Sequence, residues 1–333
     1  TQVEQLATKH GYSDSKSGFK NGVLAPFNNK LPAGFSFAVK NTGKNCLESD
    51  LTIEIGGVPI SEKGTGVQCV VKTQLALGRA ADIPVILLEE PENHLSHLNM
   101  RKLISGIEQS QQAQLFISTH SDLISTRLDL RNCILMNCAE PARTVSLGFV
   151  EEDTAKFFMK APDNNMLQFV LAKKVVLVEG DAEFILMDAF CKKVLGHGLS
   201  EQGIDVIAVD GKCFKRYLEI AKQIGIKVAV VTDNDKNYAE NITASYRGYM
   251  NNEFANIMVY ADTDDDRYTF EVAVYKDNTA ICDELFGSAR RTLTVQDYML
   301  SNKAEAAYML LSQKEESLSV PPYISEALIW LNS

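Results

Sequence analysis

The chain has 333 residues, of which 45% are hydrophobic and 23% charged, as in a globular protein long enough for two domains. No apolar run reaches membrane-spanning length and no secretory signal is visible, so we expect no membrane partner and a cytoplasmic location. The net charge of −10 argues against broad nucleic-acid binding, although a site built from carboxylates is acidic until metal ions neutralise it.

Two further features concern the state of the chain. Its seven cysteines are scattered without a C-x-x-C pair, which favours reduced thiols over a disulfide framework or a zinc site. The first residue is Thr1 rather than methionine, so we expect a processed product or a fragment.

The first part of the chain, residues 1–60, is rich in Gly, Asn and Ser. Alternating residues predict short strands over 35–39 and 51–55. The following patterns predict a helix, a strand, a helix and three strands, over 68–80, 85–88, 95–112, 114–118, 133–137 and 144–150. The domains predicted from these patterns are 1–150, a linker over 151–170, and 171–333.

The second half alternates strands and helices. The expected elements are strands over 173–178, 204–209, 227–231 and 257–260 and helices over 183–194 and 214–224. This alternation predicts an α/β fold with a mainly parallel sheet. Ligands of such sheets bind at the carboxyl ends of the strands, where Glu179, Asp233 and Asp235 fall.

Four acids make these strand ends a candidate metal site. Glu179 and Glu183 share one helix face if Gly180 opens the helix. Asp233 and Asp235 point the same way if the turn between them is extended. Brought together, the four carboxylates would repel one another unless they bound Mg²⁺ or Mn²⁺. The alternative is a set of solvated loop acids.

These two motifs resemble those of a Toprim domain, the metal-dependent fold of topoisomerases, bacterial primases and some nucleases. The resemblance covers about residues 173–332 and rests on both motifs occurring in the family's order. It implies Glu179 as a catalytic and metal-binding residue.

The segment 86–95 resembles the Walker B and D-loop region of an ABC-type ATPase, and 117–121 resembles its switch-histidine loop. The resemblance implies that Glu89 holds Mg²⁺ or its water, that Glu90 polarises the attacking water, and that His120 contacts the γ-phosphate. Many such ATPases carry Asp where this chain has Glu89, which leaves the metal geometry open.

A third segment, 60–68, resembles the ATPase signature loop, with Ser61, Gly64 and Gly66 facing a phosphate from a partner subunit. No G-x-x-x-x-G-K-[S/T] sequence occurs in the chain, so the lysine and backbone cradle for the phosphates are missing. We expect that the front of the ATPase domain has been removed; a degenerate relative that does not hydrolyse ATP is the alternative.

Three further residues complete the candidate site. The segment 268–271 resembles the T-L-E motif of nucleases of the OLD (overcoming lysogenisation defect) family, which implies that Glu271 helps bind a second metal ion. The segment 301–307 resembles that family's late lysine motif, which implies that Lys303 stabilises charge on the scissile phosphate. Lys212, after a glycine, is a candidate DNA contact. The alternatives are a helix N-terminal acid, a surface lysine and a plain turn.

An ABC-type ATPase followed by a Toprim domain is the architecture of the OLD family. The resemblance implies a two-metal DNA endonuclease that nicks or cleaves, is regulated by ATP in the complete protein, and acts in anti-phage defence, as Gabija-type and retron-associated relatives do. It implies a homodimer or larger oligomer through the ATPase heads, with a second defence protein or a retron RNA/DNA as further partners. The rivals are an ATP-gated DNA-binding or clamp protein with an inactive Toprim domain, and a topoisomerase- or primase-like enzyme.

Overall fold

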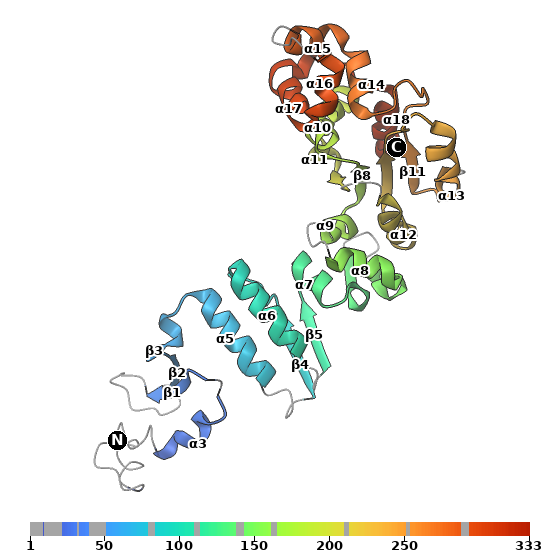
Figure 1. Cartoon of the computed structure of the whole chain (residues 1–333). Helices are drawn as coiled ribbons and strands as arrows, with labels where there is room; N and C mark the ends of the chain where they lie inside the picture. The colour runs from blue at the N-terminus through green and yellow to red at the C-terminus, as the bar shows by residue number, and fades with distance from the viewer. Residues whose placement is uncertain are drawn as a thin grey trace. The chain divides into compact units, whose positions relative to one another are not determined.

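The computed structural model divides the chain into two compact units, Thr1–Ile124 and Ser125–Ser333 (Figure 1). The residues that it describes are 9, 22–31, 33–39, 51–78, 84–109, 114–137, 143–160, 165–209, 213–250, 254–287 and 293–333. Within these residues, no helix has the length and apolar character needed to cross a membrane.

The first unit begins with a small antiparallel sheet in the order β1-β2-β3. A parallel pair of strands, β4 and β5, follows, with the crossover helix α6 between them. The elements are α3 (Ala25–Asn28), β1 (Phe35–Val39), β2 (Leu51–Ile55), β3 (Val58–Pro59), η2 (Ile60–Glu62), α5 (Thr65–Gly78), β4 (Val85–Glu89), α6 (His97–Gln109), β5 (Gln114–Ser118) and α7 (Asp122–Arg127).

The start of the second unit differs from the prediction of a linker over 151–170. The chain there forms helices, because apolar side chains at helical spacing bury themselves in the core of the second unit. Phe158 and Phe169 pack edge-to-face on Tyr217, with ring centroids 5.0 and 5.1 Å apart. The elements are η3 (Leu130–Asn132), β6 (Ile134–Asn137), β7 (Arg143–Ser146), η4 (Leu147–Phe149), α8 (Glu152–Lys160) and α9 (Met166–Leu171). The boundary between the compact units therefore lies at 124/125 rather than near 150.

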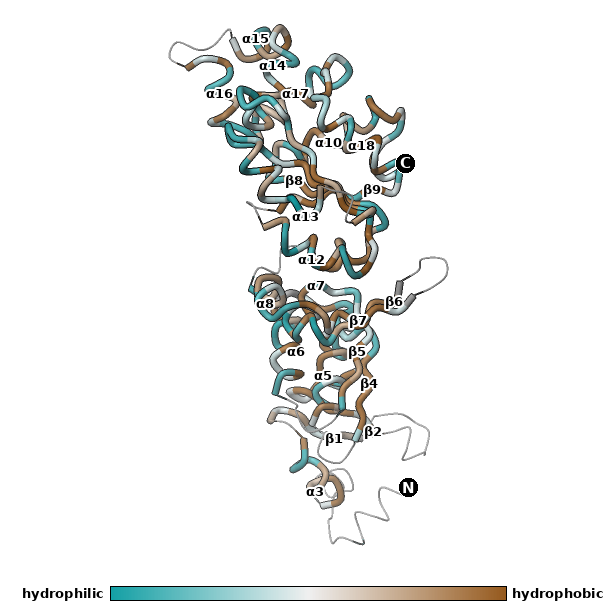
Figure 2. Tube along the Cα trace, turned by 90° about the vertical axis from the view of Figure 1, so that its right-hand side faces the viewer, coloured by the Kyte–Doolittle hydropathy of each residue, from teal (hydrophilic) through white to brown (hydrophobic). Residues whose placement is uncertain are grey.

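A parallel four-stranded sheet in the order β11-β10-β8-β9 forms the centre of the second unit. Its elements are β8 (Lys174–Val178), α10 (Asp181–Leu195), α11 (Leu199–Gln202), β9 (Ile204–Ala208), α12 (Phe214–Ile224), β10 (Lys227–Val231), the π-helix η5 (Ala239–Ala244), α13 (Arg247–Met250) and β11 (Ile257–Tyr260). Val175, Leu177, Val228 and Val230 are fully buried, as expected of parallel strands covered on both faces. Figure 2 shows the hydrophobic character of β8 as brown tube.

Two hydrophobic cores lie against this sheet. One contains Tyr217 of α12, and the other contains residues of α10 and of the C-terminal helices. Those helices are α14 (Phe270–Asp277), α15 (Thr279–Phe286), α16 (Val295–Ser301), α17 (Lys303–Lys314), η6 (Glu315–Ser317) and α18 (Pro322–Asn332). Helices α14 and α17 bring Glu271 and Lys303 to the sheet edge that carries the strand-end acids.

Candidate metal centre

The two acidic motifs meet at the carboxyl ends of β8 and β10. These strands are parallel neighbours, with Leu177 opposite Val230. Glu179 follows β8 directly, and its Oε1 accepts a hydrogen bond from the backbone N–H of Asp233 at 2.8 Å. The hydroxyl of Thr232 donates to the same oxygen. The Glu179 carboxylate is therefore fixed against the end of β10.

Glu183 lies in the first turn of α10. Gly180 is the N-cap residue, with extended backbone, and the helix begins at Asp181. The Glu183 residue is 5% exposed. Burial raises the pKa of its carboxyl group to about 8; a hydrogen bond to its own backbone N–H opposes this, and the nearby acids Asp233, Glu271 and Glu179 add to it. Glu183 therefore belongs to the same cluster.

Asp233 connects this cluster to α14. Its Oδ1 accepts a hydrogen bond from the backbone N–H of Phe270 at 2.8 Å. Burial, followed by the carboxylates of Glu179 and Glu271, raises the pKa of Asp233 to about 7, although the N–H of Phe270 and the ammonium of Lys303 act in the opposite direction. A carboxylate at the start of a helix is also favoured by the helix dipole.

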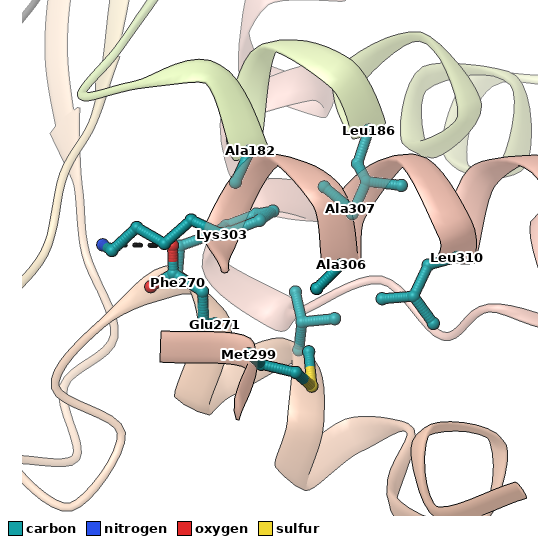
Figure 3. A pocket seen from close by; sticks show the side chains of 10 residues that line it. Ala182, Leu186, Phe270, Glu271, Met299, Lys303, Ala306, Ala307 and Leu310 are labelled. Atoms are coloured by element: carbon teal, nitrogen blue, oxygen red, sulfur yellow. Dashed lines mark ion pairs between the residues drawn. The ribbon is translucent and has the colours of Figure 1, made fainter. Parts of the chain in front are cut away.

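Glu271 is the most deeply buried acid of the cluster, with 2% of the residue exposed. It lies in the first turn of α14, whose N-cap Thr269 accepts a hydrogen bond from Val272 N–H. Both carboxylate oxygens of Glu271 are buried without a hydrogen-bond partner. Lys303 Nζ, at the start of α17, forms an ion pair with Oε1 at 3.1 Å (Figure 3).

The ion pair of Glu271 and Lys303 lies at one end of a small apolar pocket between α10, α14, α16 and α17 (Figure 3). The pocket is lined on its other sides by apolar side chains that include Leu186, Met299 and Leu310. Desolvation in this setting lowers the pKa of Lys303, but the carboxylates of Glu271, Asp233 and Glu183 outweigh it and raise the pKa above its usual value. Lys303 therefore stays charged beside the acids.

Asp235 does not follow the extended-turn prediction. The backbone turns at Asp235 and Lys236, whose φ angles are +49° and +67°. As a result Asp233 is buried and Asp235 is exposed. The extended geometry assumed for this segment is wrong because Asn234 fixes a tight turn here.

Asn234 is 1% exposed and ties three segments together. Its amide nitrogen donates to the carbonyl oxygens of Asp262 and Asp264 at 2.8 and 2.9 Å. Its amide oxygen accepts from Lys236 N–H at 2.8 Å, and its carbonyl accepts from Asn241 at 2.9 Å. A sequence reading misses this role, since Asn between two acids looks like a neutral spacer.

Tyr323 on α18 is a second residue that sequence reasoning misses. Burial is the largest cause that raises its pKa well above the usual value, and the carboxylates of Asp233 and Glu183 are the next causes. The phenol therefore lies near the acid cluster and stays protonated. No sequence motif surrounds this residue, so nothing in the pattern of residues pointed to it.

The acids fit a divalent ion that keeps part of its water shell. Among the described residues, no three His, Cys, Asp or Glu side chains converge closely enough to enclose an ion. Mg²⁺ in proteins is commonly held by one or two carboxylates together with waters and substrate phosphates. Glu271 can supply a ligand to such an ion, because its Oε1 pairs with the Lys303 ammonium while its Oε2 is buried without a hydrogen-bond partner.

The ATPase-like motifs of the first unit form a separate group. β4 ends at Glu89 opposite Ser118 of β5. The adjacent acids Glu89 and Glu90 are both exposed. His120 is exposed too, with its Nδ1 3.5 Å from Glu92 Oε1 and 3.8 Å from Glu90 Oε1. The Walker B-like and switch-histidine-like segments are therefore adjacent.

Glu92 links these two segments and was not singled out from the sequence. It is 7% exposed, and its Oε1 accepts from Thr119 Oγ1 at 2.5 Å and from His120 N–H at 2.9 Å. The sequence signal that could have identified Glu92 is its position shortly after the Walker B-like strand.

The signature-like loop opens α5. Gly66 packs against the backbone at His94, where an added Cβ would lie 2.3 Å from the carbonyl oxygen. Gly64 faces open space and Ser61 is exposed. The candidate DNA contact Lys212 lies outside the described residues.

Two family models match parts of the chain. A model described as the Overcoming lysogenization defect protein-like TOPRIM domain matches residues 170–235. A model described as an AAA domain, putative AbiEii toxin, Type IV TA system, matches residues 54–126. Glu271 and Lys303 lie outside both matches.

The chain is also similar to individual proteins. It is 28% identical over 163 residues to the Old nuclease of Escherichia phage P2, covering 45% of this chain and 28% of that protein. The chain thus spans about 28% of that relative's length.

Solved structures of C-terminal regions of OLD proteins match as well. The region from Burkholderia pseudomallei has 19% identity and a TM-score of 0.37, covering 48% of this chain and 97% of that one. The region from Xanthomonas campestris pv. campestris has 21% identity and a TM-score of 0.34, covering 48% of this chain and 94% of that one.

Proposed function

On the premise that this chain is an OLD-family ATPase–Toprim protein, with AAA-like and Toprim domains, we propose that its second unit is a metal-dependent DNA endonuclease. The observation that carries the proposal is the buried carboxyl cluster of Glu183, Asp233 and Glu271, in which Oε2 of Glu271 is buried without a hydrogen-bond partner while Oε1 pairs with the Lys303 ammonium. Such a cluster is stable when protons or cations neutralise it, and divalent cations do so at neutral pH.

The proposal gives each acid of the cluster a role. One or two carboxylates from the set Glu179, Glu183 and Asp233 hold a Mg²⁺ or Mn²⁺ ion together with waters, and Glu271 assists a second ion, with Asp235 contributing from the turn. When bound, such ions activate water and stabilise charge on a phosphate. Thr232 and the N–H of Asp233 keep Glu179 oriented. These two hydrogen bonds restrict rotation of the Glu179 carboxylate.

Lys303 is proposed to stabilise negative charge on the scissile phosphate. Its side chain is 52% exposed, so a phosphate can reach the ammonium from solvent. Its other side faces Glu271, which keeps it charged. The phenol of Tyr323 is buried and its pKa is raised well above the usual value, first by burial and then by the nearby carboxylates, so it stays protonated and does not act as a nucleophile.

The remaining proposals concern the whole protein. We propose that the AAA-like unit regulates cleavage through ATP, with Glu89, Glu90 and His120 at a site formed between two copies. Ser61, Gly64 and Gly66 would face the nucleotide of the other copy. Anti-phage defence is the proposed setting, with a second defence protein or a retron nucleic acid as candidate partners.

Nicking of a supercoiled plasmid tests the nuclease proposal. We expect cleavage with Mg²⁺ or Mn²⁺, loss of cleavage in EDTA, and loss in Glu183→Gln and Asp233→Asn. Asp181→Asn is the matched control, because Asp181 lies in the same first turn of α10 but is exposed. Titration calorimetry with Mn²⁺ gives a second readout. Metal binding without nicking would favour the rival, an ATP-gated DNA-binding protein with an inactive Toprim domain; metal-independent nicking would reject the site.

A further inference from the structure

Four lysines of the second unit each lie over an aromatic ring. The distances from Nζ to ring centroid are 5.5 Å for Lys215 over Tyr246, 4.6 Å for Lys222 over Tyr249, 4.8 Å for Lys227 over Trp330 and 4.4 Å for Lys236 over Tyr268. A ring beneath an ammonium ion attracts it and limits the freedom of a long side chain. Each charge is therefore held near a defined position while remaining able to accept an anion.

The direction of the sheet sorts these lysines into two pairs. The four strands are parallel, so α12 runs back from the carboxyl edge after β9 to the amino edge before β10. Lys215 lies in the first turn of α12 and Lys236 in the turn after β10, both on the carboxyl edge. Lys222 lies in the last turn of α12, and Lys227 is the first residue of β10, so both are at the amino edge.

The aromatic residues beneath the carboxyl-edge pair lie near the two acidic motifs. Tyr246, beneath Lys215, has a pKa raised to about 12 by burial first and by the Glu179 carboxylate second, which places the ring near Glu179. Tyr268, beneath Lys236, accepts a hydrogen bond through its carbonyl from Asp235 N–H at 3.1 Å. Lys215 therefore lies over a ring near the first acidic motif, and Lys236 lies over a ring whose residue is hydrogen-bonded to the second.

The turn that carries Lys236 is held in an uncommon conformation. Asp235 and Lys236 are consecutive non-glycine residues with positive φ, and the buried Asn234 accepts a hydrogen bond from Lys236 N–H. Two such residues in a row cost free energy that only a well-determined local structure sustains. The backbone at Lys236 is therefore fixed, and its ammonium lies over the Tyr268 ring.

We propose that Lys215 and Lys236 form a phosphate-binding rim that grips the backbone of duplex DNA on either side of the acid cluster. The inference rests on the proposed function, since it assigns the substrate contacts of the same site. Both lysines are exposed, and among the described residues no carboxylate forms an ion pair with either ammonium. In a chain with a net charge of −10, binding of a polyanion requires such local cations.

The test compares two matched double variants of the full chain. Lys215→Met/Lys236→Met removes the rim charges, and Lys222→Met/Lys227→Met removes the same chemistry from the opposite edge. Binding of a labelled duplex of about 30 base pairs is measured by fluorescence anisotropy over a KCl series, with Ca²⁺ in place of Mg²⁺ to hold the site without cleavage.

The rim variant should bind about 10- to 100-fold more weakly, and the slope of log K against log salt should fall by about two. The amino-edge variant should match the unsubstituted chain. Equal weakening of both variants, no weakening of the rim variant, or no binding by the unsubstituted chain would overturn the inference. A duplex RNA that competes as well as unlabelled DNA would overturn the choice of DNA as the partner.

Failure of the rim and failure of the proposed function are separable. If the rim variant loses binding while no preparation nicks plasmid, the rim stands and the nuclease proposal falls. If plasmid is nicked with metal at equal rates by the rim variant and the unsubstituted chain, the nuclease stands and the rim falls.

Discussion

Strands β4 and β8 begin from similar sequences and end in different surroundings. Both are runs of aliphatic residues that stop at a glutamate, Glu89 and Glu179 respectively. In β8 every residue from Val175 to Val178 is fully buried, whereas in β4 Leu87 is 75% exposed. Phe116 on the paired strand β5 is 52% exposed.

This difference extends to the acids. Near the ends of β8 and β10, Glu183 in the first turn of α10 and Asp233 after β10 are buried, and the pKa values of their carboxyl groups are raised to about 8 and 7; Glu179, directly after β8, is half-buried. At β4 the adjacent acids Glu89 and Glu90 are exposed. An aliphatic run followed by an acid therefore predicts a strand end in both units, but only the sheet that is packed on both faces has buried acids of raised pKa at its carboxyl edge.

The largest expected effect is a difference in cleavage rate between a variant of the buried acids near β8 and a variant of the exposed acids at β4. Glu183→Gln should lower the rate of metal-dependent DNA cleavage by about two to three decades or more, because a buried ligand is lost. Glu90→Gln should leave that rate in this chain nearly unchanged, because Glu90 is exposed in the other unit. Rates of plasmid nicking under single-turnover conditions measure both. A comparable loss in both variants would mean that the two units share one catalytic site.

Lys303 sharpens the comparison within the second unit. Lys303→Met should slow cleavage by about two to three decades, since one positioned charge contact to a developing anion contributes on the order of 3–4 kcal/mol. Lys314→Met is the matched control, because Lys314 lies at the other end of α17 and pairs with the exposed Glu284 at 2.7 Å. Folding is checked by the fluorescence of Trp330, the single tryptophan of the chain. Parental rates in Lys303→Met would remove the lysine's catalytic role.

The raised pKa values predict how stability depends on pH without metal. Glu183 and Asp233 hold protons in the folded chain up to about pH 8 and 7, whereas unfolded carboxyl groups release them near pH 4. The folded state thus binds more protons in this window, so the free energy of unfolding falls as pH rises from about 4 to about 8, by a few kcal/mol.

Urea unfolding followed by Trp330 fluorescence in EDTA measures this slope. Glu183→Gln should flatten it, because the amide carries no proton to lose, and Mg²⁺ should offset the loss at the alkaline end. A stability that rises with pH across this window would show that the acids are not buried together.

Part of this site follows from sequence. The strand-end positions of Glu179 and Asp233 were predictable, since aliphatic runs mark buried parallel strands and chain order fixes which edge the acids reach. Glu271 and Lys303 could be named only through resemblance to a family, because their contact joins two helices 32 residues apart. The conformation at Asp235 was not predictable, since it depends on hydrogen bonds from Asn234 to a loop about thirty residues away.

The fold of the region 151–170 was also not predictable from the local sequence. Its polar composition suggested a linker, but Phe158 and Phe169 are fully buried against Tyr217. Its apolar residues, among them Phe157, Phe158 and Phe169, are interrupted by polar ones and gave a weak periodic signal. Whether they pack depends on a partner that the local sequence does not contain.

A glycine pair in the first unit gives a smaller effect. Gly66→Ala would place a methyl group 2.3 Å from the carbonyl oxygen of His94, so the backbone must shift, at about 1–3 kcal/mol. Gly64→Ala meets open space and should change stability by less than about 0.5 kcal/mol. Hydrogen exchange of α5 amides measures the two. Equal protection in both variants would show that Gly66 does not pack on the His94 backbone.

The smallest expected effect returns to the two strands. Leu87→Ala should change the stability of the first unit by less than about 0.5 kcal/mol, because three quarters of that side chain already contacts solvent. Leu177→Ala, its counterpart on the fully buried β8, should cost about 2–5 kcal/mol through lost burial and a cavity. Amide exchange in β4 and β5 reports the first change, and urea unfolding followed by Trp330 fluorescence reports the second. A large loss of stability in Leu87→Ala would mean that this side chain is covered in solution. The difference in burial between β4 and β8 would then reflect an additional packing partner of β4 rather than a difference between the two strands themselves.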